Sequence, residues 1–125
     1  MLLNHFKTSN INIAELGVAQ SASLKMFREY FKNANIDVFD NDDQLIENSK
    51  KLQLNKVNYF HLDVNNKNKF KDLFEKNNIL YDLIIDDTSH LFDHQINVVE
   101  ETHKFLKKGG FLIIEDVFVK KKNYR

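Results

Sequence analysis

The stretch that decides the fold is Tyr81-Asp-Leu-Ile-Ile-Asp86. Its apolar residues are almost continuous rather than alternating, which predicts a strand that is buried on both faces. Such a strand is typical of a parallel sheet with helices on both sides. Polar residues follow it at once, in the order Asp87-Thr-Ser-His90. In parallel α/β sheets the chemistry lies beyond the carboxyl ends of the strands, so this segment is the first candidate for a functional site.

The rest of the chain alternates between short apolar runs and amphipathic segments. We expect strands at 11–16, 36–40, 57–62 and 111–115, and helices near 22–33, 45–52, 70–74 and 93–107. Gly109 and Gly110 are expected to stop the last helix. With right-handed crossovers, this order predicts a doubly wound α/β fold. The sheet should be mostly parallel, with five strands in the order 3-2-1-4-5 and helices on both faces.

Composition limits the classes of protein that the chain can belong to. Its 125 residues predict a single domain over 1–125, with a core at about 11–118 and a basic tail at 119–125. A hydrophobic content of 42% with 11 Phe excludes a disordered chain. The 18 basic and 18 acidic side chains cancel, which argues against a nucleic-acid partner. No apolar run approaches the roughly 18 residues of a membrane span, so we expect a cytoplasmic protein without a membrane partner.

Acidic residues follow all five predicted strands. They are Glu15, Asp40, Asp63, Asp86 with Asp87, and Glu115 with Asp116. The carboxyl ends of parallel strands meet at one edge of the sheet, so these side chains should converge. Like charges raise one another's pKa unless a cation or hydrogen-bond donors fill the space between them. We therefore expect this edge to hold a cation, hydroxyl groups, or both. The absence of Cys excludes a thiolate metal site.

Gly17 follows the first strand and precedes a helix that should begin near Ser21 or Ser23. A glycine there allows a ligand to approach the backbone closely, and the helix start offers free N–H groups. The same glycine can also serve only as a tight turn. From the residues alone these two interpretations are equally supported.

Several segments together resemble a known family. The run from Glu15 to Ser23 looks like the first motif of the Rossmann-like S-adenosylmethionine-dependent methyltransferases. The run from Leu106 to Asp116 is similar to their fifth-strand segment. Asp86-Asp-Thr-Ser-His90 narrows the resemblance to the metal-dependent macrolide sugar O-methyltransferases and their cephalosporin-hydroxylase-like relatives. The resemblance covers roughly residues 11–118.

The resemblance implies roles for the residues at the strand ends. Contacts to S-adenosylmethionine fall on Glu15, Gly17, Ser23, Asp40, Asp63 and Asp86. Asp87, Glu115 and Asp116 would bind Mg²⁺, and His90 would act as the general base toward a small-molecule hydroxyl acceptor. Ser89 is expected to cap a helix or contact the cofactor. His94 lies four residues after His90, a spacing at which two His can share a metal, but we expect it to pack or to support the site.

The chain also departs from the family. Ala19 and Ser21 stand where the first loop usually has glycines, so this loop is expected to be stiffer. Thr88 replaces a glycine of the Asp-Asp-x-Ser-His signature, which constrains the backbone where it turns. The family core usually continues with two more strands, and without them strand five is an open edge. A homodimer or a partner chain is expected to cover it.

Two other functions stay open. A catalytically silent methyltransferase-like module would bind the cofactor or nothing and serve as a subunit. A phosphoacceptor receiver domain has a similar length and five parallel strands. It ranks lower, because it needs paired acids after the first strand and a Lys after the fifth, where this chain has Glu15 and Glu115-Asp116. A nicotinamide-binding domain ranks lower still, because its glycine spacing is absent.

Overall fold

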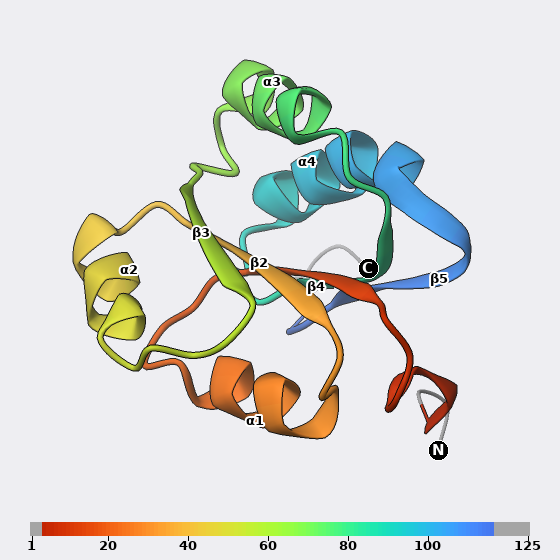
Figure 1. The fold of residues 1–125 in the computed structure, drawn as a ribbon. Helices are drawn as coiled ribbons and strands as arrows, with labels where there is room; N and C mark the ends of the chain where they lie inside the picture. Colours follow the sequence, from red (N-terminus) through yellow and green to blue (C-terminus); the bar gives the residue numbers. More distant parts are fainter. Residues whose placement is uncertain (1–3, 117–125) are drawn as a thin grey trace.

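The fold is an α/β sandwich built on one parallel sheet (Figure 1). The computed structural model describes residues 4–116. The strands are β1 (Asn12–Leu16), β2 (Asn35–Asp40), β3 (Val57–His61), β4 (Tyr81–Asp86) and β5 (Leu106–Ile114). The helices are α1 (Ala22–Tyr30), α2 (Asp43–Lys50), α3 (Lys67–Asn77) and α4 (Phe92–Thr102), with short 3₁₀ turns at Asn4–Phe6 and His103–Phe105. The predicted strand order, β3-β2-β1-β4-β5, is confirmed, and all four pairings are parallel.

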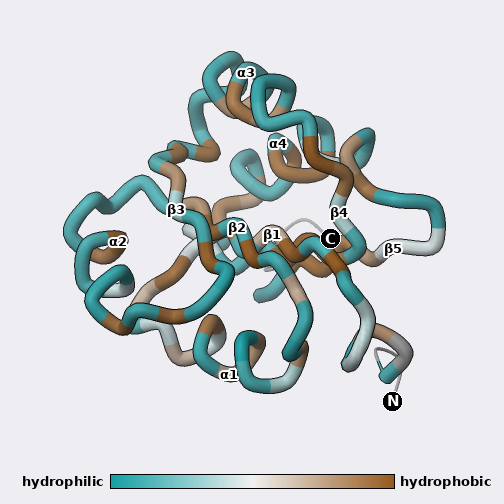
Figure 2. Tube along the Cα trace, in the orientation of Figure 1, coloured by the Kyte–Doolittle hydropathy of each residue, from teal (hydrophilic) through white to brown (hydrophobic). Residues whose placement is uncertain are grey.

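The helices divide between the two faces of the sheet, and each face has its own apolar core. Figure 1 shows α1 and α2 on one side and α3 and α4 on the other. Leu24 and Phe31 belong to the first core, and Phe70, Phe74 and Val98 to the second. The hydropathy colouring of Figure 2 places hydrophobic segments along the central strands between these layers. This double burial explains the nearly continuous apolar strands of the sequence.

Local hydrogen bonds fix where the helices begin and end. Asp42 caps α2 by accepting from the backbone N–H groups of Gln44 and Leu45. The Asn66 side chain accepts from Lys69 N at the start of α3. At the other end of α1, the Arg28 guanidinium donates to four backbone carbonyls, those of Phe31, Lys32, Ala34 and Asn55. It thereby ties the end of the helix to the loops that lead into β2 and β3.

Two predicted element ends are wrong. The first helix ends at Tyr30 instead of 33. The fourth ends at Thr102, and β5 already begins at Leu106, so the two glycines lie inside the strand rather than at a helix stop. They stand where the register between β4 and β5 shifts. A Cβ on Gly110 would lie 2.9 Å from the Asp82 carbonyl oxygen, so close approach of two backbones explains that glycine.

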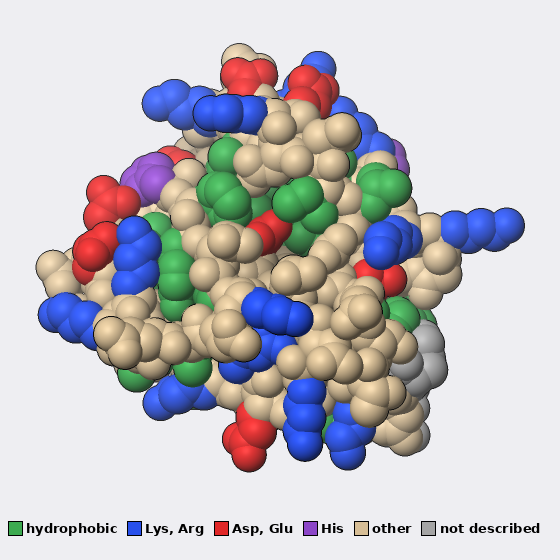
Figure 3. Space-filling view, viewed as in Figure 1, with side chains coloured by type: hydrophobic (Ala, Val, Ile, Leu, Met, Phe, Trp, Pro, Cys, Tyr) green, Lys and Arg blue, Asp and Glu red, His purple; other side chains and the backbone are tan. Residues whose placement is uncertain are grey.

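The outer surface agrees with the balanced charge of the sequence. On the face drawn in Figure 3, Lys and Arg side chains are spread around the outline, with acidic side chains between them. No helix among residues 4–116 is long and apolar enough to cross a membrane. The predicted basic tail at 119–125, and the last residues of the predicted core at 117–118, lie outside the described residues. The cytoplasmic location and the absence of a nucleic-acid partner stay predictions.

Candidate functional site

Backbone hydrogen bonds join the loops that follow the strands. Gly17 N donates to Phe39 O over 2.7 Å, Asp87 N donates to Leu16 O over 2.9 Å, and Glu115 N donates to Asp86 O over 2.9 Å. Each bond ties the first residue after β1, β4 or β5 to the end of a neighbouring strand. The residues after these three strands are therefore held at one edge of the sheet, as the sequence predicts.

Gly17 is required by this convergence. Its φ is +94°, and a Cβ built on it would overlap the carbonyl oxygen of Asp87. No L side chain fits there without displacing the loop after β4. A glycine is therefore needed at position 17 because two loops of the chain approach each other closely there. A tight turn alone would not explain this requirement.

The loop after Gly17 keeps a glycine-like backbone without glycines. Ala19 has a φ of 42° and Ser21 a φ of 69°, both in the left-handed region. These are the positions where glycines are expected from the resemblance, and the left-handed conformation is one that glycine adopts at no steric cost. In the signature segment the left-handed residue is not the one that replaces glycine. Thr88 has an ordinary φ, and His90 takes the left-handed conformation with a φ of 62°.

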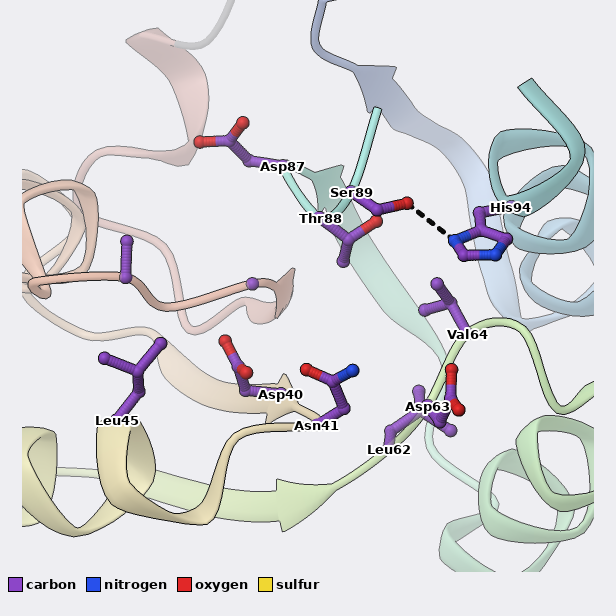
Figure 4. A pocket seen from close by; sticks show the side chains of 12 residues that line it. Asp40, Asn41, Leu45, Leu62, Asp63, Val64, Asp87, Thr88, Ser89 and His94 are labelled. Carbon is purple, nitrogen blue, oxygen red and sulfur yellow. Dashed lines mark hydrogen bonds between the residues drawn. The ribbon is translucent and has the colours of Figure 1, made fainter. Parts of the chain in front are cut away.

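A pocket of about 300 Å³ lies at this edge of the sheet (Figure 4). Its lining comes from the loops after β1, β2, β3 and β4 and from the first turns of α2 and α4. The lining residues are Gly17, Ala19, Asp40, Asn41, Leu45, Leu62, Asp63, Val64, Asp87, Thr88, Ser89 and His94. Three of the predicted cofactor contacts, Gly17, Asp40 and Asp63, are among them.

Asp40 is the most firmly held acid of the pocket. Its Oδ2 accepts from Val18 N over 2.8 Å, and its Oδ1 accepts from Asp42 N over 2.8 Å. The carboxylate thus joins the loop after β1 to the start of α2. Each oxygen keeps acceptor capacity, because an ionised carboxylate has about four lone-pair positions. Asp63 lies opposite on the loop after β3, exposed, with Oδ1 accepting from Asn65 N.

His94 contributes more to the pocket than the sequence indicates. Its Nδ1 lies 2.6 Å from Ser89 Oγ, and both side chains line the cavity (Figure 4). His90 cannot share a helix face with His94, because α4 begins only at Phe92. The spacing of four residues between His90 and His94 therefore does not place the two imidazoles on one helix face, where they could share a metal. Ser89 also accepts weakly from Leu91 N over 3.4 Å, but Leu91 is itself the cap residue and α4 has no side-chain cap hydrogen bond, so the expected capping role is wrong.

Beside the pocket lies a cluster of two carboxylates and an imidazole. His90 Nε2 is 3.4 Å from Asp87 Oδ1 and 3.6 Å from Asp116 Oδ2. One ligand atom from each of these three residues lies within 4.8 Å of the others, a spacing that can hold a metal ion. Asp116, like His90, has a left-handed backbone, with a φ of 56°. Strained non-glycine residues gathered in this way are typical of functional sites.

Glu115, the third predicted metal ligand, adjoins the cluster. It is hydrogen-bonded to Asp87. Burial raises the pKa of Glu115, and the nearby charges of Asp87 and Asp116 raise it further. A cation that entered the cluster would offset the charge repulsion at Glu115.

Glu15 lies behind the cluster and is buried. Burial, followed by the negative charges of Asp87 and Glu115, raises the pKa of Glu15 to about 8. Its Oε2 has no hydrogen-bond partner among the residues that the structure describes. At neutral pH the side chain is therefore mostly protonated. The charge crowding that the sequence predicts is strongest at this residue.

Besides Glu15, two predicted cofactor residues stand apart from the pocket lining. Asp86 is 2% exposed, and its Oδ1 accepts from both the backbone N–H and the hydroxyl of Thr88. Ser23 is exposed in the first turn of α1. Asp86 thus shapes the loop that carries Asp87. The cofactor role of both residues stays a prediction.

Comparison with known proteins supplies the fold assignment. No protein-family model matches the sequence, and no curated protein matches it either. Among solved structures, the plantazolicin methyltransferase BpumL in complex with SAH is similar, with 22% identity and a TM-score of 0.70. The match covers 90% of this chain and 41% of that one. The chain has the Rossmann-like methyltransferase fold.

Two further structures support the same assignment. A putative caffeoyl-CoA O-methyltransferase from Staphylococcus aureus has 19% identity and a TM-score of 0.66, with 84% of this chain and 49% of that one covered. The fibrillarin pre-rRNA processing protein of Methanococcus jannaschii has 14% identity and a TM-score of 0.71, and the match covers 93% of this chain and 51% of that one. The chain thus spans about half the length of these proteins.

Proposed function

We propose that this protein is an S-adenosylmethionine-dependent O-methyltransferase that uses Mg²⁺ and acts on a hydroxylated small molecule or sugar. One observation carries the proposal. Asp87 belongs both to the pocket lining and to the cluster with His90 and Asp116. A cofactor in the pocket and an acceptor hydroxyl at the cluster would therefore be neighbours, which methyl transfer requires.

The pocket supports S-adenosylmethionine as the cofactor. Asp40 and Asp63, the two acids that the resemblance assigns to the ribose and the adenine edge, face it from the ends of β2 and β3. Leu45, Leu62 and Val64 supply apolar surface of the kind that a base needs. Among the similar structures, BpumL is in complex with SAH.

The acidic cluster supports Mg²⁺. Carboxylate oxygens are the protein ligands that this ion prefers, and Asp87, Glu115 and Asp116 would hold it. When bound, the ion would lower the pKa of an acceptor hydroxyl. Burial, followed by the negative charges of Asp87 and Asp116, raises the pKa of Glu115, and a bound cation would offset the effect of those charges.

His90 is the residue that we assign to proton removal. Its side chain is about one-third exposed, and Nε2 points to the two carboxylates of the cluster. A neutral imidazole is a suitable general base for a hydroxyl proton. Asp87 and Asp116 would stabilise the resulting imidazolium, since both oxygens lie within 3.6 Å of Nε2. His90 would keep the proton of the acceptor hydroxyl, whose oxygen would receive the methyl group as the S–CH₃ bond of the cofactor breaks and S-adenosylhomocysteine leaves.

The test separates metal binding from catalysis. Mn²⁺, as a paramagnetic substitute for Mg²⁺, is titrated into the protein and followed by electron paramagnetic resonance. We expect one site in the unaltered chain, lost in Asp87→Asn and in Asp116→Asn. Glu47→Gln is the matched control, because Glu47 lies on the exposed side of α2 and pairs only with Lys50 in the described structure. Equal Mn²⁺ binding by the control and the site variants would contradict the metal proposal.

The second step uses methyl-labelled S-adenosylmethionine with a pool of sugars and phenols. We expect Mg²⁺-dependent transfer of label by the unaltered chain and a loss of at least roughly a hundredfold in His90→Gln. Binding of S-adenosylhomocysteine should stay within about twofold in that variant. A His90→Gln protein that transfers the methyl group at the original rate would exclude His90 as the base.

The catalytically silent module is the second candidate. The observation that favours it is the loop after β1, where Ala19 and Ser21 replace the glycines of the resembling motif in left-handed conformations. It predicts S-adenosylhomocysteine binding without label transfer to any acceptor. The two steps above therefore distinguish the candidates.

A further inference from the structure

An apolar stripe runs along one side of α4. Phe92, Ile96 and Val99 recur at helical spacing and are 62%, 38% and 44% exposed, and Leu91, just before the helix, is 56% exposed. Residues at i, i+4 and i+7 form one face of a helix. The buried face of α4 is a different one, formed by residues such as Gln95, Val98 and Thr102. The stripe is thus additional to the face that α4 already packs against the sheet.

The contacts of α4 show which way the stripe points. Contacts toward α3 and the loop before it come from Asn97 and Glu100 of α4 and from Lys104 of the 3₁₀ turn that follows α4. Glu100 pairs with Lys67, Lys104 lies 3.6 Å from Glu75, and Asn97 donates to Val64 O. Toward β5, the Gln95 side chain donates to the carbonyls of Glu115 and Asp116, just beyond the strand. Phe92 and Val99 lie within about one turn of Gln95, so the stripe borders the β5 side of α4, and Glu100, one turn after Ile96, lies between the stripe and α3.

The edge of β5 lies beneath this stripe and is open in the described structure. β5 pairs with β4 on one side and with no other strand among residues 4–116. Ile113 is 36% exposed, and it pairs with Ile85 and so adds apolar surface to this edge on the α1 and α2 side of the sheet. An unpaired strand edge beside an apolar helix flank is an adhesive surface that soluble proteins cover.

The charges of β5 indicate what covers it. Lys107 and Lys108 stand at the start of the strand, an uncharged stretch follows, and Glu115 and Asp116 come directly after its end. Two such strands side by side in antiparallel orientation bring the basic end of each next to the acidic end of the other. In parallel orientation like charges would meet. The strand is therefore complementary in charge to a second copy of itself.

We propose that the chain forms a two-fold symmetric dimer through β5 and α4. A two-fold axis perpendicular to the sheet pairs the two β5 edges antiparallel and keeps both α4 helices on the same face. The stripes of Phe92, Ile96 and Val99 then meet across the axis. Each residue contacts the same surface on the second copy, as an isologous interface requires. The dimer places Lys108 of the second copy beside the acidic end of β5.

Sedimentation velocity over a range of protein concentrations tests the proposal without any cofactor, so the result is independent of the proposed function. We expect a concentration-dependent dimer of the unaltered chain. Ile96→Lys and Val99→Lys should each raise the dissociation constant at least roughly tenfold. Met26→Lys is the matched control, since Met26 is 57% exposed on α1, on the other face of the sheet, and should leave the constant unchanged.

A charge exchange tests the antiparallel orientation. Lys108→Glu and Glu115→Lys should each weaken the dimer, because each places like charges together twice. An equimolar mixture of the two variants should restore it, because both contacts then become attractive. Circular dichroism confirms that every variant is folded. A monomer of the unaltered chain at all concentrations would overturn the dimer, and so would equal weakening by Ile96→Lys and Met26→Lys. A mixture that stays monomeric would overturn the orientation.

Discussion

At the residue scale, the site is built from backbone conformations that side chains seldom adopt. Ala19, Ser21, His90 and Asp116 all have positive φ values and all lie at the carboxyl edge of the sheet. Each such residue costs on the order of 1 kcal/mol. The surrounding hydrogen bonds, above all those of Asp40 to Val18 N and Asp42 N, hold the loops in place against this strain.

Ala19→Gly should therefore stabilise the protein. Ala19 has a φ of 42° and is exposed, so removing its Cβ relieves strain without opening a cavity. After the gain in chain entropy of the unfolded state is subtracted, we expect an increase of about 0.5–1 kcal/mol in the free energy of unfolding. Urea denaturation measures it. Ala22→Gly, three residues on in the first turn of α1, should lower the same quantity by about 0.5–1 kcal/mol. A decrease in Ala19→Gly would show that the loop is not strained.

Glu15 predicts how stability changes with pH. Its pKa is about 8 in the folded chain, well above its ordinary value of 4.5. The stabilising effect of the protonated form is complete below pH 4.5 and is lost as the pH rises through 8. Glu15→Gln stays neutral, so it should be more stable than the unaltered chain by on the order of 4 kcal/mol at pH 8 and equally stable near pH 4. Thermal unfolding at both pH values measures this. If the two proteins differed in stability by the same amount at pH 4 and at pH 8, a buried and protonated Glu15 would be contradicted.

At the element scale, the short α2 depends on its cap. The Asp42 side chain accepts from Gln44 N and Leu45 N, and Leu45 lines the pocket one turn later. Asp42→Ala should lower the free energy of unfolding by about 1 kcal/mol, whereas Asp42→Asn, which keeps an acceptor, should lower it by a few tenths. Chemical denaturation of the three proteins side by side is the measurement. Equal losses in both variants would show that charge at the helix terminus matters more than the hydrogen bonds.

The sequence predicts the strands better than the ends of the helices. Strands buried on both faces must be apolar throughout, so Leu83-Ile-Ile85 already indicates a central parallel strand. The sequence carries no comparable signal for the end of α4 at Thr102. Of the two glycines that suggest a helix stop, Gly110 instead allows a close backbone contact with Asp82, and Gly109 has a positive φ of 82°. The strand order brings Asp87, His90 and Asp116 together, so their proximity can be predicted from the topology. The contact between Ser89 and His94 depends on the residue at which α4 begins, and the spacing of the two residues in the sequence does not reveal that residue.

At the scale of the whole molecule, one edge of the sheet unites two environments. The pocket offers Asp40 and Asp63 on walls that carry apolar side chains, and the adjoining cluster concentrates negative charge around His90. The fold places them next to each other because the loops after β1, β2 and β4 are joined by backbone hydrogen bonds. A cofactor pocket beside an acidic cluster is the arrangement from which we infer methyl transfer.

Binding of S-adenosylhomocysteine, followed by titration calorimetry, tests this account most directly. We expect micromolar affinity in the unaltered chain and in Asp72→Asn, a control on the exposed side of α3. Asp40→Asn, which keeps one acceptor for the loop N–H groups, should bind at least roughly tenfold more weakly. Absence of binding by the folded, unaltered chain would contradict the assignment of the pocket to this cofactor.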